Sequence, residues 1–211
     1  MQIYAFLGPA RVGKTSASNH LHEVCEKRGY YVQRLSFAGP IKAGCARLGV
    51  TKEEQPDEYR SLAQRWGAGR RLRNPLHYIR KMGRAIERIR RVEQEDYAKL
   101  DAQGKLDCWD ETVIIIDDVR YENEVKALTD IGAEVCFLNP GERLNLTEEF
   151  RQHESEALSN KLVNDDEFLE EFMSEYECWE LPADQSEEMM MQLIDVYCDH
   201  LWFNSTFPHL H

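Results

Sequence analysis

One short glycine-containing segment near the start of the chain constrains its fold more than any other feature. It places two glycines, a lysine and a threonine at the spacing of a phosphate-binding loop. The segment reads Gly8-Pro9-Ala10-Arg11-Val12-Gly13-Lys14-Thr15. The apolar run 3–7 before it has strand character, and residues 16–28 after it follow a helical pattern with Leu21 and Val24 facing inward. A loop of this kind between a strand and a helix predicts an α/β fold.

The residue types explain how such a loop would hold a nucleotide. Gly8 and Gly13 let the backbone curl so that successive N–H groups face a β-phosphate. Lys14 would reach the β- and γ-phosphates, and the Thr15 hydroxyl would bind Mg²⁺. We therefore expect ATP and Mg²⁺ as ligands; the alternative is a plain glycine turn with a surface lysine. The residues expected around the nucleotide are Gly8, Arg11, Val12, Gly13, Lys14, Thr15 and Ser16.

Composition narrows the range of partners. The 211 residues carry a formal charge of -12, which argues against a broad surface for binding nucleic acid. Small-molecule nucleotides are therefore the expected partners, and no stable nucleic-acid partner is expected. The six cysteines include no Cys-x-x-Cys pair, and reduced thiols in the cytoplasm are the simplest interpretation. No apolar run approaches membrane-spanning length, so no membrane partner is expected. A homodimer is compatible with the sequence.

The order of strand-like and helix-like segments predicts the architecture. Strands are expected at 3–7, 30–37, 113–116, 134–138 and 177–181. Helices are expected at 121–131, with Val125, Leu128 and Ile131 at helical spacing, and at 187–202. Alternation of this kind predicts a doubly wound parallel sheet of about five strands in a single domain, 1–211.

The region 51–107 is too long for an ordinary connection between strands, and we expect a helical insert there. Between Arg70 and Arg91 it holds nine basic residues and a single acid, Glu87. These basic residues would form either a solvated helix face paired with acids such as Glu93 and Glu95, or a lid whose arginines close over phosphates.

A second chemical signal lies where the apolar run 113–116 ends in Asp117-Asp118. Carboxylates at the open end of a parallel sheet can hold Mg²⁺ or orient an attacking group. The alternative is that one of the two aspartates caps the following helix.

Several segments together give the chain a resemblance to a known family. Besides the loop, they are Phe37-Ala38-Gly39-Pro40-Ile41-Lys42, Arg60-Ser61-Leu62-Ala63-Gln64-Arg65-Trp66-Gly67, Asp118-Val119-Arg120-Tyr121-Glu122-Asn123-Glu124 and His153-Glu154-Ser155-Glu156. In this order they resemble the deoxynucleoside monophosphate kinases of tailed bacteriophages. The chain departs from the family pattern at Tyr121 and Glu122, where phenylalanine and proline are usual, and at Arg11, an unusual charge inside the loop.

The resemblance implies a phosphate-loop kinase fold with a helical lid or acceptor-binding insert, working in the host-cell cytoplasm. The implied reaction transfers the γ-phosphoryl group of ATP to a deoxynucleoside 5′-monophosphate, giving a diphosphate and ADP. Catalysis would use Lys14, Asp118 and Arg120, and Mg²⁺ would be held by Thr15 and Asp117. The acceptor would contact Arg60, Gln64, Arg70, Arg71, Asp117, Asp118 and Glu124.

Two other functions fit the same sequence. One is a phosphate-loop kinase with another acceptor, such as a modified base in phage DNA or a small-molecule alcohol. The other is a regulator that binds nucleotide without transferring phosphate.

Overall fold

The computed structural model describes residues 1–101, 112–141, 154–183 and 188–196. Its contacts divide the chain into two compact units. The first, here the sheet unit, is Met1–Gln33 with Asp110–His211, and the second, here the helical unit, is Arg34–Trp109.

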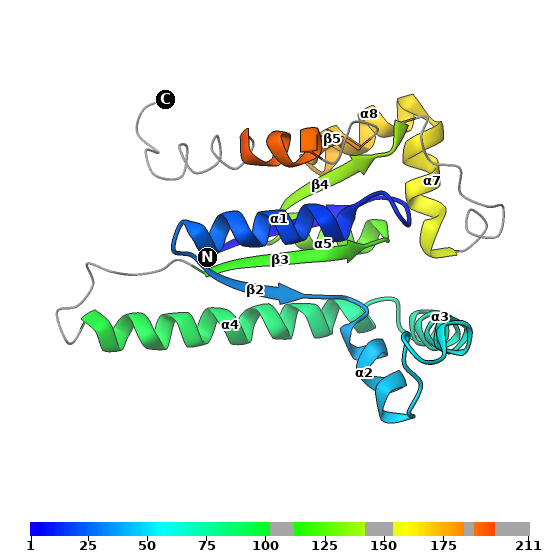
Figure 1. Cartoon of the computed structure of the whole chain (residues 1–211), viewed down its shortest axis with the longest axis horizontal. Helices are drawn as coiled ribbons and strands as arrows, with labels where there is room; N and C mark the ends of the chain where they lie inside the picture. The colour runs from blue at the N-terminus through cyan, green and yellow to red at the C-terminus, as the bar shows by residue number, and fades with distance from the viewer. Residues whose placement is uncertain (102–111, 142–153, 184–187, 197–211) are drawn as a thin grey trace. The chain divides into compact units, whose positions relative to one another are not determined.

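The strands form one five-stranded, all-parallel sheet in the order β2-β3-β1-β4-β5 (Figure 1). Their bounds are β1 Gln2–Leu7, β2 Tyr31–Leu35, β3 Thr112–Val119, β4 Glu134–Asn139 and β5 Trp179–Pro182. The run Val113 to Ile116 is fully buried, as expected for a central strand covered on both faces. The predicted parallel sheet is confirmed. β3 is longer than predicted, because it continues through Asp117 and Asp118.

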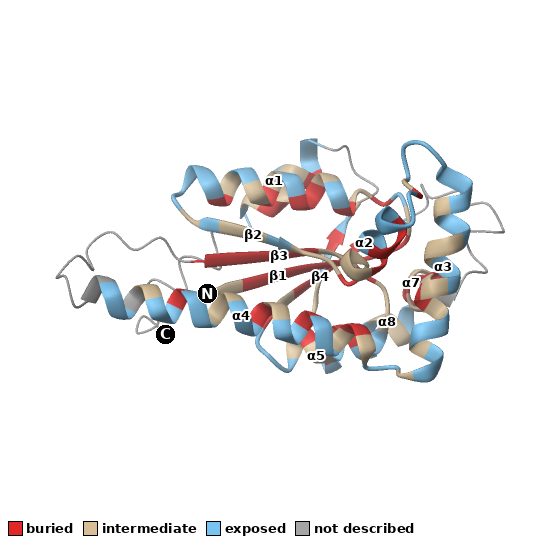
Figure 2. Cartoon of the chain, turned by 90° about the horizontal axis from the view of Figure 1, so that it is seen from below, coloured by how far each residue is buried: buried red, intermediate tan, exposed pale blue. Residues whose placement is uncertain are grey.

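Helices cover both faces of this sheet. α1, Lys14–Lys27, lies on one face, and α5, Glu122–Thr129, lies on the other (Figure 2). Ala17, Leu21 and Cys25 recur every four residues on α1 and are buried in the core, with Val24 packed beside them. The prediction that Leu21 and Val24 face inward is confirmed.

The predicted helix 121–131 is shorter than the pattern indicates. Val125 and Leu128 are buried, but α5 ends at Thr129 and Ile131 is 43% exposed, so the prediction was wrong for Ile131. Gly132 takes a φ of 78°, and its N–H bonds to the Thr129 carbonyl, which turns the chain out of the helix.

The C-terminal part of the sheet unit adds short helical segments. These are η3 Glu154–Glu156, α7 Ala157–Asn164, α8 Asp166–Glu175 and a helix over 188–196. Asp165 caps α8 by accepting from the Phe168 N–H, and Met190 and Ile194 are buried in the core. His153 and the part of the predicted helix over 197–202 lie outside the described residues.

The helical unit is built from α2 Gly39–Arg47, α3 Pro56–Arg73 and α4 His77–Asp101. α3 and α4 lie within the region expected as a helical insert, of which 102–107 is outside the described residues. Across the described chain, no helix has both the length and the apolar character to cross a membrane.

Because all the strands are parallel, the loops that follow β1, β3 and β4 leave the sheet at one edge. The predicted phosphate loop, residues 8–15, therefore meets the segment after β3 there, which brings residues about a hundred positions apart close together.

We expect Gly8→Ala to destabilise the sheet unit more than Gly132→Ala. Both glycines have a positive φ, which costs an L-residue about 1–2 kcal/mol. A Cβ on Gly8 would also lie 2.9 Å from the Leu138 carbonyl oxygen, whereas one on Gly132 meets nothing within 4 Å. Urea unfolding should show an extra loss of about 1–3 kcal/mol for Gly8→Ala. Equal losses in the two variants would contradict the steric constraint at Leu138.

Candidate phosphoryl-transfer site

The predicted phosphate loop is a tight turn between β1 and α1. Its backbone passes through three positive φ values, 149° at Gly8, 66° at Arg11 and 100° at Gly13. No side chain caps the first turn of α1, whose N-cap is Gly13, so the first-turn N–H groups are left to an incoming anion. This geometry suits the binding of a phosphate group.

The other expected loop residues differ in exposure. Val12 is buried against the core, whereas Arg11 and Thr15 are exposed and Ser16 is half-buried. Arg11 is one of two non-glycine residues with a positive φ in the described chain, a backbone conformation usually left to glycine. Val12 therefore anchors the loop, and Arg11 and Thr15 face outward.

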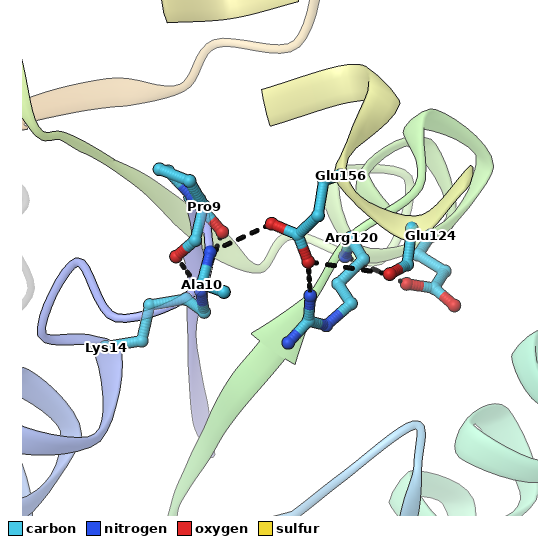
Figure 3. Close-up of polar contacts among 8 residues, drawn as sticks. Pro9, Ala10, Lys14, Arg120, Glu124 and Glu156 are labelled. Carbon is cyan, nitrogen blue, oxygen red and sulfur yellow. Dashed lines mark hydrogen bonds and ion pairs between the residues drawn. The ribbon is translucent and has the colours of Figure 1, made fainter. Parts of the chain in front are cut away.

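Lys14 is a buried charged residue whose ammonium group is held by the loop backbone. It is 8% exposed, and its Nζ donates to the carbonyls of Gly8 and Pro9 at 2.6 Å each (Figure 3). Burial lowers the pKa of Lys14 to about 7, and Arg120 adds to that effect. Nearby carboxylates act in the opposite direction; they belong to Glu156, Asp118 and Asp117. The loop itself, the segment 117–120 and Glu156 thus all affect the protonation of the Lys14 ammonium group.

The two aspartates sit at an irregularity in the sheet. Ala5 pairs with Ile116 but Leu7 pairs with Val119, so Phe6 faces both Asp117 and Asp118 across the ladder. A shift of this kind re-aims side chains at the end of a strand. The Ser18 hydroxyl, at the start of the second turn of α1, lies 3.4 Å from Asp117 Oδ2. The shift thus places Asp117 beside the start of α1.

Neither aspartate caps the next helix. The N-cap of α5 is Tyr121, and no side chain bonds there as a cap. Instead, Oε2 of Glu124, a fully buried residue, accepts from the Arg120 backbone N–H at 3.1 Å. Glu124, expected near the acceptor, holds the turn after β3 in this structure.

Glu156 joins this turn to the phosphate loop. One carboxylate oxygen accepts from the Ala10 N–H at 2.9 Å, and the other forms an ion pair with Arg120 Nη1 (Figure 3). The side chain of Glu156 is 5% exposed and that of Arg120 is 32% exposed. Arg120 is therefore fixed at its backbone by Glu124 and at its guanidinium by Glu156.

Thr15 and Asp117 were expected to hold Mg²⁺ bound together with ATP. The described residues contain no group of three or more His, Cys, Asp or Glu side chains that could hold a metal. Mg²⁺ with a nucleotide needs only one or two protein oxygens, since phosphates and water complete its shell. Thr15, at the start of α1, and Asp117, which lies 3.4 Å from the Ser18 hydroxyl, could supply such oxygens.

The residues expected to contact the acceptor phosphate fall on two sides of α3. Arg60, Gln64 and Arg71 share one side with the buried Gly67, by their spacing of four, three and four residues. Arg70 lies on another side, where it lines a cavity of the helical unit. The sheet-unit residues of the prediction do come together: Lys14 is influenced by Asp117, Asp118 and Arg120.

The cavity lies among α2, α3 and α4 and has a volume of about 370 Å³, within the range of small-molecule sites. Its lining includes three cationic side chains and three aromatic rings. The cations are Arg47, Arg70 and Lys81, and the rings are those of Trp66, His77 and Tyr78. Trp66 packs so closely on α2 that a Cβ on Gly44 would lie 2.6 Å from its ring. Burial lowers the pKa of His77, and Lys81 and Arg70 add to the shift. The cavity thus combines flat rings with a positive field.

Other basic residues of this unit make surface ion pairs. Arg90 lies 3.8 Å from Glu87, and Arg91 lies 3.8 Å from Glu95. For these two arginines the expectation of a solvated, ion-paired face is confirmed, and pairs of this kind add little to stability.

Sequence reasoning missed some of the residues that build these sites. It assigned no role to Glu156, whose only signal was its place in the His153 to Glu156 segment, or to Ser18. Of the cavity lining it gave a role only to Arg70, because the rings of Trp66 and Tyr78 come from separate helices.

Comparison with known proteins adds no relative. No protein-family model matches the chain, and a search of curated proteins finds no significant match.

We expect the affinity for ATP to fall as the pH rises above about 7. The pKa of Lys14 is lowered to about 7 in the free protein, whereas bound phosphates would raise it, so binding takes up a proton between the two values. Affinity is then greatest below the free-protein pKa and falls by up to about tenfold per pH unit above it.

Isothermal titration with ATP between about pH 7 and pH 9 measures this dependence. Lys14→Arg is the matched control, because an arginine stays charged over the whole range and should remove the slope. A wild-type affinity that does not change with pH would contradict the role of Lys14.

Proposed function

We propose that this chain is an ATP-dependent kinase of deoxynucleoside monophosphates with the fold of phosphate-loop kinases. One observation carries the proposal: Glu156 links the Ala10 N–H, in the loop that buries Lys14, to the guanidinium of Arg120. Phosphoryl transfer between two anions depends on alignment and positive charge more than on a strong base. A buried lysine, an arginine and two carboxylates at one loop suit that requirement.

The donor half of the reaction belongs to the loop. In the free protein the ammonium of Lys14 is held by the carbonyls of Gly8 and Pro9, and the β- and γ-phosphates of ATP would take their place as partners. The uncapped N–H groups at the start of α1 would bind the β-phosphate. Thr15 and Asp117 would hold Mg²⁺, which supplies charge neutralisation when bound.

In the transfer itself, an oxygen of the acceptor 5′-phosphate forms a bond to the γ-phosphorus. The bond from that phosphorus to the β–γ bridging oxygen breaks, and ADP leaves with the electron pair. The acceptor oxygen is already anionic, so no base has to remove a proton. Arg120 offsets charge on the transferred group, and Asp118 orients the acceptor side.

The acceptor would bind in the cavity of the helical unit. Its rings, Trp66 and Tyr78, can pack against a base, and its cations can bind a monophosphate. Arg71 is not among the lining residues, but its guanidinium lies 4.7 Å from the centre of the Tyr78 ring, so its charge is close to the cavity. A kinase of nucleotides would work in the cytoplasm, where such metabolites occur. The described cysteines are free thiols, as is usual in that reducing compartment.

The first test is ADP formation with ATP, Mg²⁺ and each common deoxynucleoside or ribonucleoside monophosphate. We expect turnover that requires a deoxynucleoside monophosphate. Lys14→Ala should abolish it through lost phosphate positioning, and Asp118→Asn should lower kcat with the fold intact.

The same assay separates the alternative functions. Nucleotide binding without acceptor-dependent turnover would support a regulator instead, and turnover only with DNA or an alcohol would support another acceptor.

The second test concerns the cavity. Arg70→Ala should raise the KM for the monophosphate by about tenfold or more, as expected for a lost charged hydrogen bond, and leave the KM for ATP unchanged. Arg73→Ala, on the same helix but not among the lining residues, is the matched control. Equal effects of the two variants on the acceptor KM would place the acceptor elsewhere.

A further inference from the structure

The contact made by Glu156 spans the widest sequence separation in the site. Its Oε2 accepts from Ala10 in the phosphate loop, 146 positions away, and its Oε1 pairs with Arg120 after β3. A single carboxylate therefore touches both segments that the proposed reaction needs.

Glu156 is itself firmly placed. It is the N-cap residue of α7, and its side chain is 5% exposed. Ser159 and Leu162 of α7 are buried, and Phe172 of α8 is buried as well. A carboxylate anchored by packed helices can fix a partner that would otherwise sample many rotamers.

Arg120 is such a partner. Its backbone is held by Glu124 at 3.1 Å, but only the ion pair with Glu156 holds its guanidinium among the contacts resolved in the described residues. The ion pair uses Nη1, and the side chain remains 32% exposed. Other guanidinium donors can therefore meet a phosphate while Glu156 holds the group in place.

A carboxylate this close to a phosphate site opposes the binding of an anion by its own charge. Glu156 offsets that repulsion only if its contacts improve the alignment of the Arg120 guanidinium with the loop that contains Ala10. The carboxylate of Glu156 bridges the two groups, with one oxygen on Ala10 and the other on Arg120, and this bridge can hold them in alignment.

We propose that Glu156 is a positioning residue that sets the guanidinium of Arg120 against the phosphate loop, toward the γ-phosphoryl group. This inference rests on the proposed kinase function. Glu156 acts through Arg120 and does not touch the reacting atoms.

The test is a double-mutant cycle of Glu156→Gln and Arg120→Ala. A glutamine has the shape of Glu156 but only one acceptor oxygen, so it cannot accept from both Ala10 and Arg120. We expect Glu156→Gln alone to lower kcat by about 10- to 100-fold, with little change in the KM for ATP. In the Arg120→Ala background the loss of kcat should be at least about fivefold smaller, because only the contact with Ala10 remains to be lost.

A second measurement on the same four proteins needs no turnover. It compares the equilibrium affinity for ATP with that for ADP. Glu156→Gln should reduce the preference for ATP when Arg120 is present and leave it unchanged in the Arg120→Ala background. A protein without acceptor-dependent transfer but with this coupling would overturn the kinase proposal and support the role of Glu156.

Glu122→Gln is the matched control. Glu122 accepts from the Tyr176 hydroxyl at 2.9 Å in the same unit, so its loss should lower the melting temperature without changing kcat. If Glu156→Gln does not fold, Glu156→Asp replaces it, since the shorter side chain keeps the charge but cannot span both partners. An equal loss of kcat with and without Arg120 would overturn the positioning role.

Discussion

The burial of one ammonium group, that of Lys14, is the interaction on which the site depends. Two carbonyls accept from it at 2.6 Å, and only a loop curled through Gly8 and Gly13 brings them there. These two hydrogen bonds do not fully offset the cost of burying a charge, and the pKa of Lys14 therefore falls to about 7. The charged form of Lys14 is therefore disfavoured in the free loop, and a bound phosphate would stabilise it.

The parallel sheet explains why other charges gather around that lysine. Strands β1 and β3 end at one edge, and the register shift after Ala5 places two aspartates opposite Phe6. Arg120 follows on the next turn, fixed at both ends by carboxylates. The site is thus a product of strand order and of one local irregularity in pairing.

Local signals in the sequence were sufficient for the sheet and for the loop. Runs such as Val113 to Ile116 gave the strands, because a buried parallel strand needs a continuous apolar stretch. The end of α5 was mispredicted, because Ile131 fits the helical spacing while Gly132 turns the chain. Glu156 and the cavity around Trp66 could not be predicted, since both depend on contacts between segments far apart in the chain. The resemblance to a kinase family pointed to Arg120 but not to the group that holds it.

The most direct test follows the phosphoryl group itself. With ATP labelled at the γ-phosphoryl, Mg²⁺ and a deoxynucleoside monophosphate, the label should appear on the terminal phosphate of the deoxynucleoside diphosphate. It should not appear there when Lys14 is replaced by alanine. Label that is released only as inorganic phosphate, or that stays in bound ATP, would contradict the account.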